Sequence, residues 1–224
     1  MRFLLGSSFF DGGKPDRQAM AQLWINNVAR MDVKPNKVVV IGEGGAKIPS
    51  LWGDVVRLTG DLGHIHAHLD NGPKSHHAFT GWSASVLALA MLSYIDESDF
   101  LYRESDCFAF GPWVTRMYRD CGDRGWVFGP KMTSAPWMAC AQSLFLVKHG
   151  TIPHFVEQFL KRGDERARNR IGETRFVDMD RSIPAARLSF GVDRMRPIPW
   201  DDDAFYFQQP TAAELEEAKR RNLI

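Results

Sequence analysis

The stretch that decides the fold is FLYRESDCFAFGP, residues 100–112. Its two apolar runs, Phe100 to Tyr102 and Cys107 to Phe110, are typical of buried strands. Between them stand four polar residues, Arg103, Glu104, Ser105 and Asp106. Carboxylates held so close to a core need a partner, because an unpaired buried charge is costly. The partner is either a cationic side chain, as in an ordinary charged turn, or a hard metal ion bound by carboxylates two positions apart.

The residues upstream of this stretch predict a parallel sheet. Phe3 to Leu5 and Lys37 to Ile41 are predicted strands, and apolar residues recur at helical spacing from Met20 to Met31. A strand, helix, strand order is a βαβ unit, whose ligands bind at the carboxyl ends of its strands. We expect a third strand at Val55 to Leu58 and a long helix from about Phe79 to Tyr94.

The second half of the chain is less regular. Residues 113–129 have a mixed pattern, and Met138 to Val147 predicts a short helix or strand. His154 to Leu160 has helical spacing, whereas prolines keep Phe176 to Trp200 irregular. Thr211-Ala-Ala-Glu214 is a capping box that opens a charged terminal helix.

Composition limits the classes of protein to which the chain can belong. Its 224 residues are 44% apolar and carry a net charge of +1, which favours a folded domain and argues against a nucleic-acid partner. Three cysteines without CxxC spacing favour a reducing compartment. Met1 to Phe10 is too short for a signal peptide, and no apolar run approaches the ~18 residues of a membrane span. We therefore expect a cytoplasmic protein with no integral membrane segment; its oligomeric state is not predicted.

The βαβ unit, Glu43 after its second strand, the helix upstream and then residues 100–112 together resemble the GT-A glycosyltransferases. The resemblance covers about residues 1–147. In that family an Asp-x-Asp motif follows a buried strand and holds the metal of a nucleoside diphosphate sugar, whereas Glu104 replaces the first Asp here. The resemblance implies an α/β, Rossmann-like GT-A fold, a mostly parallel central sheet flanked by helices. It would be a single domain with a nucleotide-sugar half at about 1–111, an acceptor half at about 112–210 and a C-terminal helix at 211–224.

The same resemblance implies a set of ligands and the residues that bind them. Mn²⁺ or Mg²⁺ would be held by Asp106 and Glu104. The loop from Ser7 to Asp11 would meet the nucleotide, Glu43 would bind the base or ribose, and the start of the helix would attract the diphosphate. The residues expected at the nucleoside diphosphate sugar are Ser7, Ser8, Phe9, Asp11, Glu43, Lys74, His77, Thr80, Gly81, Ser83, Arg103, Glu104 and Ser105.

The implied reaction transfers a hexose or deoxyhexose to a hydroxyl group of a glycan or glycoconjugate acceptor. Glu173 and Asp178 are the candidates for a base that takes the acceptor proton. Trp137 offers a stacking face for a sugar ring, and Gln142 offers hydrogen bonds to it.

Three other functions stay open on the sequence. A sugar nucleotidyltransferase uses the same combination of metal and diphosphate. A metal-dependent hydrolase would bind zinc or iron through a set of histidines. A nucleotide- or carbohydrate-binding module would bind the ligand without turnover. The histidines of the hydrolase hypothesis are His64, His66, His68, His76 and His77.

Overall fold

The first helices and strands occur along the chain in the order that the sequence predicts. The computed structural model describes residues 1–9, 15–42, 55–59, 81–130, 142–161, 179, 185–192 and 194–224. The strands are β1 (Phe3–Phe9), β2 (Lys37–Gly42), β3 (Val55–Thr59), β4 (Asp99–Arg103), β5 (Cys107–Phe110), β6 (Trp126–Phe128), β7 (Leu144–Val147), β8 (Ala186–Arg187) and β9 (Phe205–Gln208). The helices are α1 (Pro15–Val28), α3 (Gly81–Ile95), α4 (Trp113–Cys121), η1 (His149–Thr151), α5 (Ile152–Lys161) and α7 (Ala212–Arg220).

The central sheet has seven strands in the order β3-β2-β1-β4-β7-β6-β8. β1 pairs in parallel with both β2 and β4, and β2 pairs in parallel with β3. β7 is antiparallel to β4 and to β6, while β8 is parallel to β6. Among the described strands of this central sheet, β7 alone runs against the rest. The predicted βαβ unit and the mostly parallel sheet are therefore confirmed.

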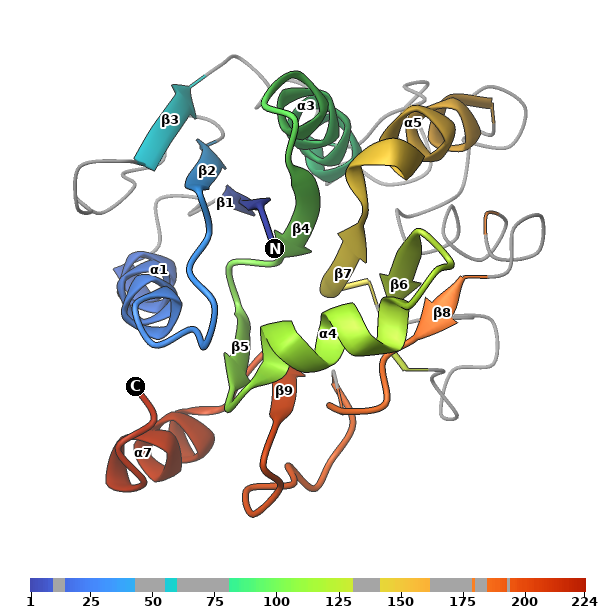
Figure 1. Cartoon of the computed structure of the whole chain (residues 1–224). Coiled ribbons are helices and arrows are strands. Elements are labelled where there is room, and N and C mark those ends of the chain that lie inside the picture. Colours follow the sequence, from blue (N-terminus) through green and yellow to red (C-terminus); the bar gives the residue numbers. More distant parts are fainter. Residues whose placement is uncertain are drawn as a thin grey trace.

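Helices cover both faces of this sheet, with α1 and α4 on one side and α3 and α5 on the other (Figure 1). Successive residues of a strand point to opposite faces, so each apolar strand supplies both cores. Leu5 and Leu101 belong to the cluster that includes residues of α1 and α4. Leu4 and Phe100 belong to the cluster with α3 and α5. These strands are buried on both faces of the sheet, which explains why their sequences are continuously apolar.

β5 leaves the central sheet and pairs with β9 in a separate two-stranded sheet. The segment between β4 and β5 is therefore a passage from one sheet to another rather than a hairpin. Phe108 and Phe110 stack on Phe207, and Trp200 packs edge-on against the same ring. This aromatic cluster fixes β9, and with it the residues that end β9, beside the carboxyl end of β4.

The start of α4 is capped by a residue from the segment before β2. The Asp32 carboxylate accepts hydrogen bonds from the backbone N–H groups of Val114 at 3.1 Å and Thr115 at 3.0 Å, and from the Thr115 hydroxyl at 2.8 Å. Gly111 makes the turn into the helix at φ 73°, where a Cβ would lie 1.8 Å from the carbonyl oxygen of Asp203. Only glycine fits there, so the turn and the distant cap together place α4.

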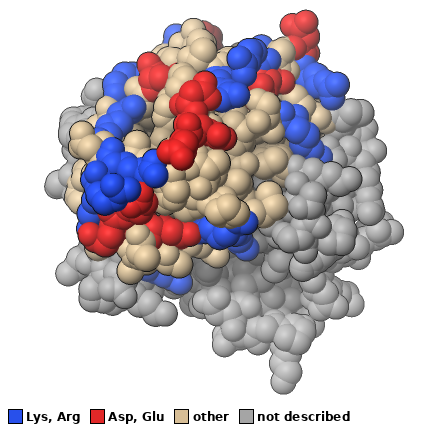
Figure 2. All heavy atoms as spheres, turned by 90° about the horizontal axis from the view of Figure 1, so that it is seen from below, with Lys and Arg blue, Asp and Glu red and all other residues tan. Residues whose placement is uncertain are grey.

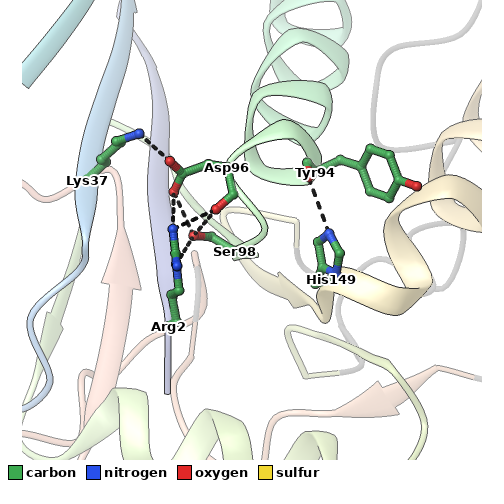
Figure 3. Close-up of polar contacts among 6 residues, drawn as sticks. All are labelled: Arg2, Lys37, Tyr94, Asp96, Ser98 and His149. Carbon is green, nitrogen blue, oxygen red and sulfur yellow. Dashed lines mark hydrogen bonds and ion pairs between the residues drawn. The ribbon is translucent and has the colours of Figure 1, made fainter.

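A polar cluster ties α3 to the amino ends of β1 and β2 (Figure 3). Asp96, just after α3, accepts hydrogen bonds from Lys37 and, at 2.7 Å, from the Ser98 hydroxyl. Arg2 donates to the Asp96 carbonyl at 2.9 Å. The bonds from Lys37 and Ser98 hold the pKa of Asp96 below its usual value. This cluster lies at the end of the parallel strands opposite to the segment that follows β4.

The same edge of the sheet is bonded to α4 and η1. Asp99 accepts hydrogen bonds from the Tyr118 hydroxyl at 2.6 Å and from the backbone N–H of His149 at 2.7 Å. The His149 ring stacks on Tyr94 at 5.1 Å, and its Nε2 lies 3.2 Å from the Tyr94 carbonyl oxygen (Figure 3). The amino edge is thus occupied by contacts that join elements of the fold.

Acidic and basic side chains lie side by side on the face seen from below (Figure 2). Arg116 pairs with Asp203, Arg221 with Asp201 and Glu217, and Lys219 with Glu216. These charged side chains are therefore paired with each other. No helix in the described part of the chain has the length and apolar character to cross a membrane.

Candidate functional site

The candidate site is the acidic turn, which we define as Glu104, Ser105 and Asp106, between β4 and β5 (Figure 1). Because β1, β2, β3 and β4 are parallel, it lies at their carboxyl edge, where α/β sheets bind ligands. The Ser8 hydroxyl near the end of β1 lies 2.9 Å from the Tyr102 hydroxyl on β4. Polar groups from two neighbouring strands therefore meet beside the turn.

The backbone of the acidic turn is held on both sides. The Glu104 N–H donates to the Ser143 carbonyl at 2.9 Å, just before β7, and the Cys107 N–H closes the turn onto the Glu104 carbonyl at 3.0 Å. The Gln209 N–H donates to the Asp106 carbonyl at 3.2 Å, just after β9. Glu104 and Asp106 are thus presented by a tight turn.

The two carboxylates nevertheless converge on one atom. Gln208, buried at the end of β9, donates from Nε2 to Asp106 Oδ1 at 3.0 Å and to Glu104 Oε2. Two oxygens that bond one nitrogen face the same point. Carboxylate oxygens suit Mg²⁺ or Mn²⁺, which keep further positions for water and phosphate oxygens. The donor set therefore fits a hard divalent cation.

Burial, the largest influence, raises the pKa of Asp106 above its usual value. The hydrogen bond from Gln208 and the charges of Arg194 and Arg17 act in the opposite direction. A cation bound against the carboxylate would favour the ionised form in the same way. No group of three or more His, Cys, Asp or Glu that could hold a metal occurs among the described residues. A metal at the acidic turn would accordingly have two carboxylate ligands from these residues.

Gln142 lies next to the turn, directly before Ser143. Its side chain is 7% exposed, and its Oε1 has no hydrogen-bond partner within the described part of the protein. A buried acceptor that lacks a partner is costly unless a ligand or water satisfies it. Trp137 and Gln142 are the two residues predicted to bind the acceptor sugar. Of these, Gln142 lies within the described residues, beside the acidic turn.

Arg103 occupies a different place from the one expected. Its guanidinium is fully buried and donates to Asn27 Oδ1 at 2.6 Å and to the Trp24 carbonyl at 3.2 Å. It also lies 4.5 Å from the Trp24 ring centroid and 5.7 Å from that of Trp113. Alternation along β4 explains this, because Arg103 shares the face of Leu101, toward α1 and α4. These contacts favour a role in holding helices to the sheet instead of binding diphosphate.

The predicted nucleotide loop begins later than expected. Ser7, Ser8 and Phe9 belong to β1, which pairs with β2 as far as Phe9 and Gly42. Ser7 and Phe9 are buried, and Ser8 is half-buried. Pairing with the apolar strand β2 extends β1 beyond the apolar run that ends at Leu5. Of these three side chains, Ser8 is the most exposed to a ligand.

Several predicted residues are only partly described or not described. Gly81 and Ser83 lie in the first turn of α3, as expected for that helix. Outside the described residues lie Asp11, Glu43, Lys74, His77, Thr80, Trp137, Glu173 and Asp178, and the histidines of the hydrolase hypothesis, His64, His66, His68 and His76.

Sequence reasoning missed three side chains that shape this region: Gln208 and Arg194 at the acidic turn, and Asn27 beneath it. Gln208 directly follows a run of aromatic residues, just as the acidic turn follows the apolar run of β4. This similarity is the signal in the sequence that could have pointed to Gln208. The pairing of β5 with β9, which brings the two run ends together, is not readable from either run alone.

The mostly parallel central sheet and the helices on both of its faces match the GT-A fold of nucleotide-diphospho-sugar transferases. The galactosyltransferase LgtC, solved with donor and acceptor sugar analogues, superposes with a TM-score of 0.52 at 9% identity, over 95% of this chain and 88% of LgtC. A putative glucose-1-phosphate thymidylyltransferase from Bacillus anthracis superposes with a TM-score of 0.56 at 8% identity, over 99% of this chain and 95% of the enzyme.

The glycosyltransferase GlyE of Streptococcus pneumoniae gives a TM-score of 0.50 at 11% identity over 84% of this chain. The chain spans only 44% of the length of GlyE. No family model matches the sequence, and no curated protein matches it. At these identities the likeness concerns the fold.

Proposed function

We propose that the protein is a glycosyltransferase that moves a hexose or deoxyhexose from a nucleoside diphosphate sugar to a hydroxyl acceptor on a glycan or glycoconjugate. Asp106 and Glu104 hold Mn²⁺ or Mg²⁺ in this proposal. The observation that carries it is the convergence of these two carboxylates on one point at the carboxyl edge of a GT-A-like sheet.

In the transfer, the bond from the anomeric carbon to the diphosphate oxygen breaks and a bond to the acceptor oxygen forms. A bound divalent cation would neutralise the charge that develops on the departing diphosphate. The unpartnered Oε1 of Gln142 accepts a hydrogen bond from a sugar hydroxyl near the reacting carbon. Glu173 or Asp178 takes the proton of the acceptor hydroxyl if the enzyme inverts the anomeric configuration.

The donor is bound by the first half of the chain, up to about residue 111, and the acceptor by residues from about 112 to 210. Ser8 contributes from the end of β1, and Trp137 stacks on a sugar ring. The remaining donor contacts in this proposal are Asp11, Glu43, Lys74, His77, Thr80, Gly81, Ser83 and Ser105.

A thermal-shift screen of nucleoside diphosphates and their sugars, with and without Mn²⁺, tests the proposal. A ligand that binds only the folded state raises the melting temperature. We expect a nucleotide to do so in a Mn²⁺-dependent way, and Asp106→Asn to abolish the dependence. Burial already disfavours the ionised form of Asp106, so this neutral variant should fold. Asp202→Asn, at an exposed carboxylate, is the matched control and should keep the response.

A metal-dependent shift that survives Asp106→Asn, or no shift with any nucleotide, contradicts the proposal. A sugar nucleotidyltransferase is the second candidate, because the putative thymidylyltransferase shares the fold at a TM-score of 0.56. That activity consumes a nucleoside triphosphate and a sugar phosphate and releases pyrophosphate. Pyrophosphate release from that substrate pair, without release of nucleoside diphosphate from a nucleotide sugar, would favour it.

A further inference from the structure

The contacts of Gln208 extend beyond the two carboxylates. Its Oε1 accepts a hydrogen bond from Arg194 Nε at 3.0 Å. A guanidinium can only donate, so it must face the amide oxygen and not the amide nitrogen. Arg194 therefore turns the NH₂ group of Gln208 toward Glu104 and Asp106. The orientation of the amide follows from this network of donors and acceptors.

A second arginine fixes the backbone at the same place. Arg196 donates to the carbonyls of Gln208 at 3.2 Å and Gln209 at 3.3 Å, and to Glu214 in the first turn of α7 at 3.0 Å. The pairing of β9 with β5 adds further backbone bonds. In these contacts Arg194, which is exposed, bonds the side chain of Gln208, whereas Arg196 bonds the backbone. A substitution of Arg194 is therefore expected to affect the Gln208 amide more than the course of β9.

We propose that Arg194 and Gln208 are a positioning pair that holds the carboxylates of Glu104 and Asp106 together, ready for a cation. This inference rests on the proposed function, because it concerns the same cation. Two carboxylates repel each other, and the shared NH₂ group offsets the repulsion before the cation arrives. Groups that already converge lose less freedom on binding, which tightens binding. Arg194 is not itself a ligand: it orients the Gln208 amide, and its charge also lies close enough to influence Asp106.

Mn²⁺ binding to the full-length chain tests this inference directly, without sugar transfer. Mn²⁺ is titrated alone and with each common nucleoside diphosphate, and bound Mn²⁺ is followed by water-proton relaxation. We expect Arg194→Gln to raise the apparent Kd for Mn²⁺ about three- to tenfold, the effect of losing one hydrogen bond of ordinary strength. Arg194→Lys, which keeps the charge but not the planar fork, should show a smaller increase. The melting temperature should stay within ~2 °C of wild type in both variants.

Arg221→Gln is the matched control, since Arg221 bonds Asp201 and Glu217 and neither carboxylate belongs to the acidic turn. It should leave the Kd for Mn²⁺ unchanged. If wild type binds Mn²⁺ and Arg194→Gln binds it as tightly or more tightly, the positioning role is refuted while the proposed function stands. If wild type binds no Mn²⁺ under any of these conditions, both are refuted. A Gln208→Leu variant that binds Mn²⁺ more tightly would mean that the amide competes with the cation, which also refutes the inference.

Discussion

Replacing Asn27 with leucine tests how the buried Arg103 is accommodated. The Asn27 amide makes three buried hydrogen bonds: it accepts from Arg103 Nη1 at 2.6 Å and from the Ala109 N–H at 3.3 Å, and it donates to the Ala109 carbonyl at 3.0 Å. Burial lowers the pKa of Arg103 to about 10, so the guanidinium stays charged at neutral pH. Asn27→Leu leaves that charge and two backbone groups without these partners.

The cost follows from the kinds of bond that are lost. A hydrogen bond to a charged group contributes ~1.5–3 kcal/mol and each neutral one ~0.5–1.5 kcal/mol, so the sum is roughly 2.5–6 kcal/mol. Urea unfolding followed by circular dichroism measures it through the midpoint and slope. Arg103→Met should cost less, because replacing a buried charge with an apolar side chain removes its desolvation penalty.

The double variant separates the pairwise contribution from the rest. Combining Asn27→Leu with Arg103→Met should destabilise the protein less than the sum of the two single variants, by ~1.5–3 kcal/mol, because no buried charge is left behind. Additive effects, or a cost below ~1 kcal/mol for Asn27→Leu, would refute the view that the amide satisfies Arg103.

Three further predictions concern the fold. Asp32→Ala should cost ~1 kcal/mol by removing the cap of α4, and an unchanged melting temperature would contradict this role. Gly6→Val should lower the free energy of unfolding by about 1–3 kcal/mol. The reason is that a Cβ at position 6 would lie 2.9 Å from Leu89 and 3.1 Å from the Phe100 ring. A variant as stable as wild type in urea would contradict that packing. The hydrogen bond from Arg196 lowers the pKa of Glu214 below its usual 4.5. The Glu214 contribution to stability is therefore present above about pH 4.5 and is lost as the pH falls through the folded-state pKa. Between pH 6 and pH 3, urea titrations should show that wild type loses stability more steeply than Glu214→Gln.

The central strands and the helix before the acidic turn could be predicted because their signals are local. Lys37 to Ile41 and Val55 to Leu58 differ from β2 and β3 by one residue each, and the predicted helix from Phe79 corresponds to α3. The capping box at Thr211 is present, with the Glu214 N–H bonded to the Thr211 hydroxyl at 3.3 Å. Each of these patterns is complete within a short segment.

The features that escaped prediction depend on distant partners. α4 carries Arg116 and Arg119 among its apolar residues and is capped by Asp32 from another segment, so residues 113–129 had a mixed pattern. β8 has two residues, too few for a periodic signal. Arg103 was assigned to the turn because it adjoins Glu104, although alternation along β4 turns its side chain to the other side.

The partnership of Gln208 with Asp106 spans 102 positions of the chain, and this has a consequence for synthesis. The acidic turn precedes β9 in the chain, so it gains its amide partner only after β9 has been synthesised. Until then the two carboxylates lack the NH₂ group that they share in the folded protein. The site thus depends on a part of the chain that is synthesised well after the turn that carries its carboxylates.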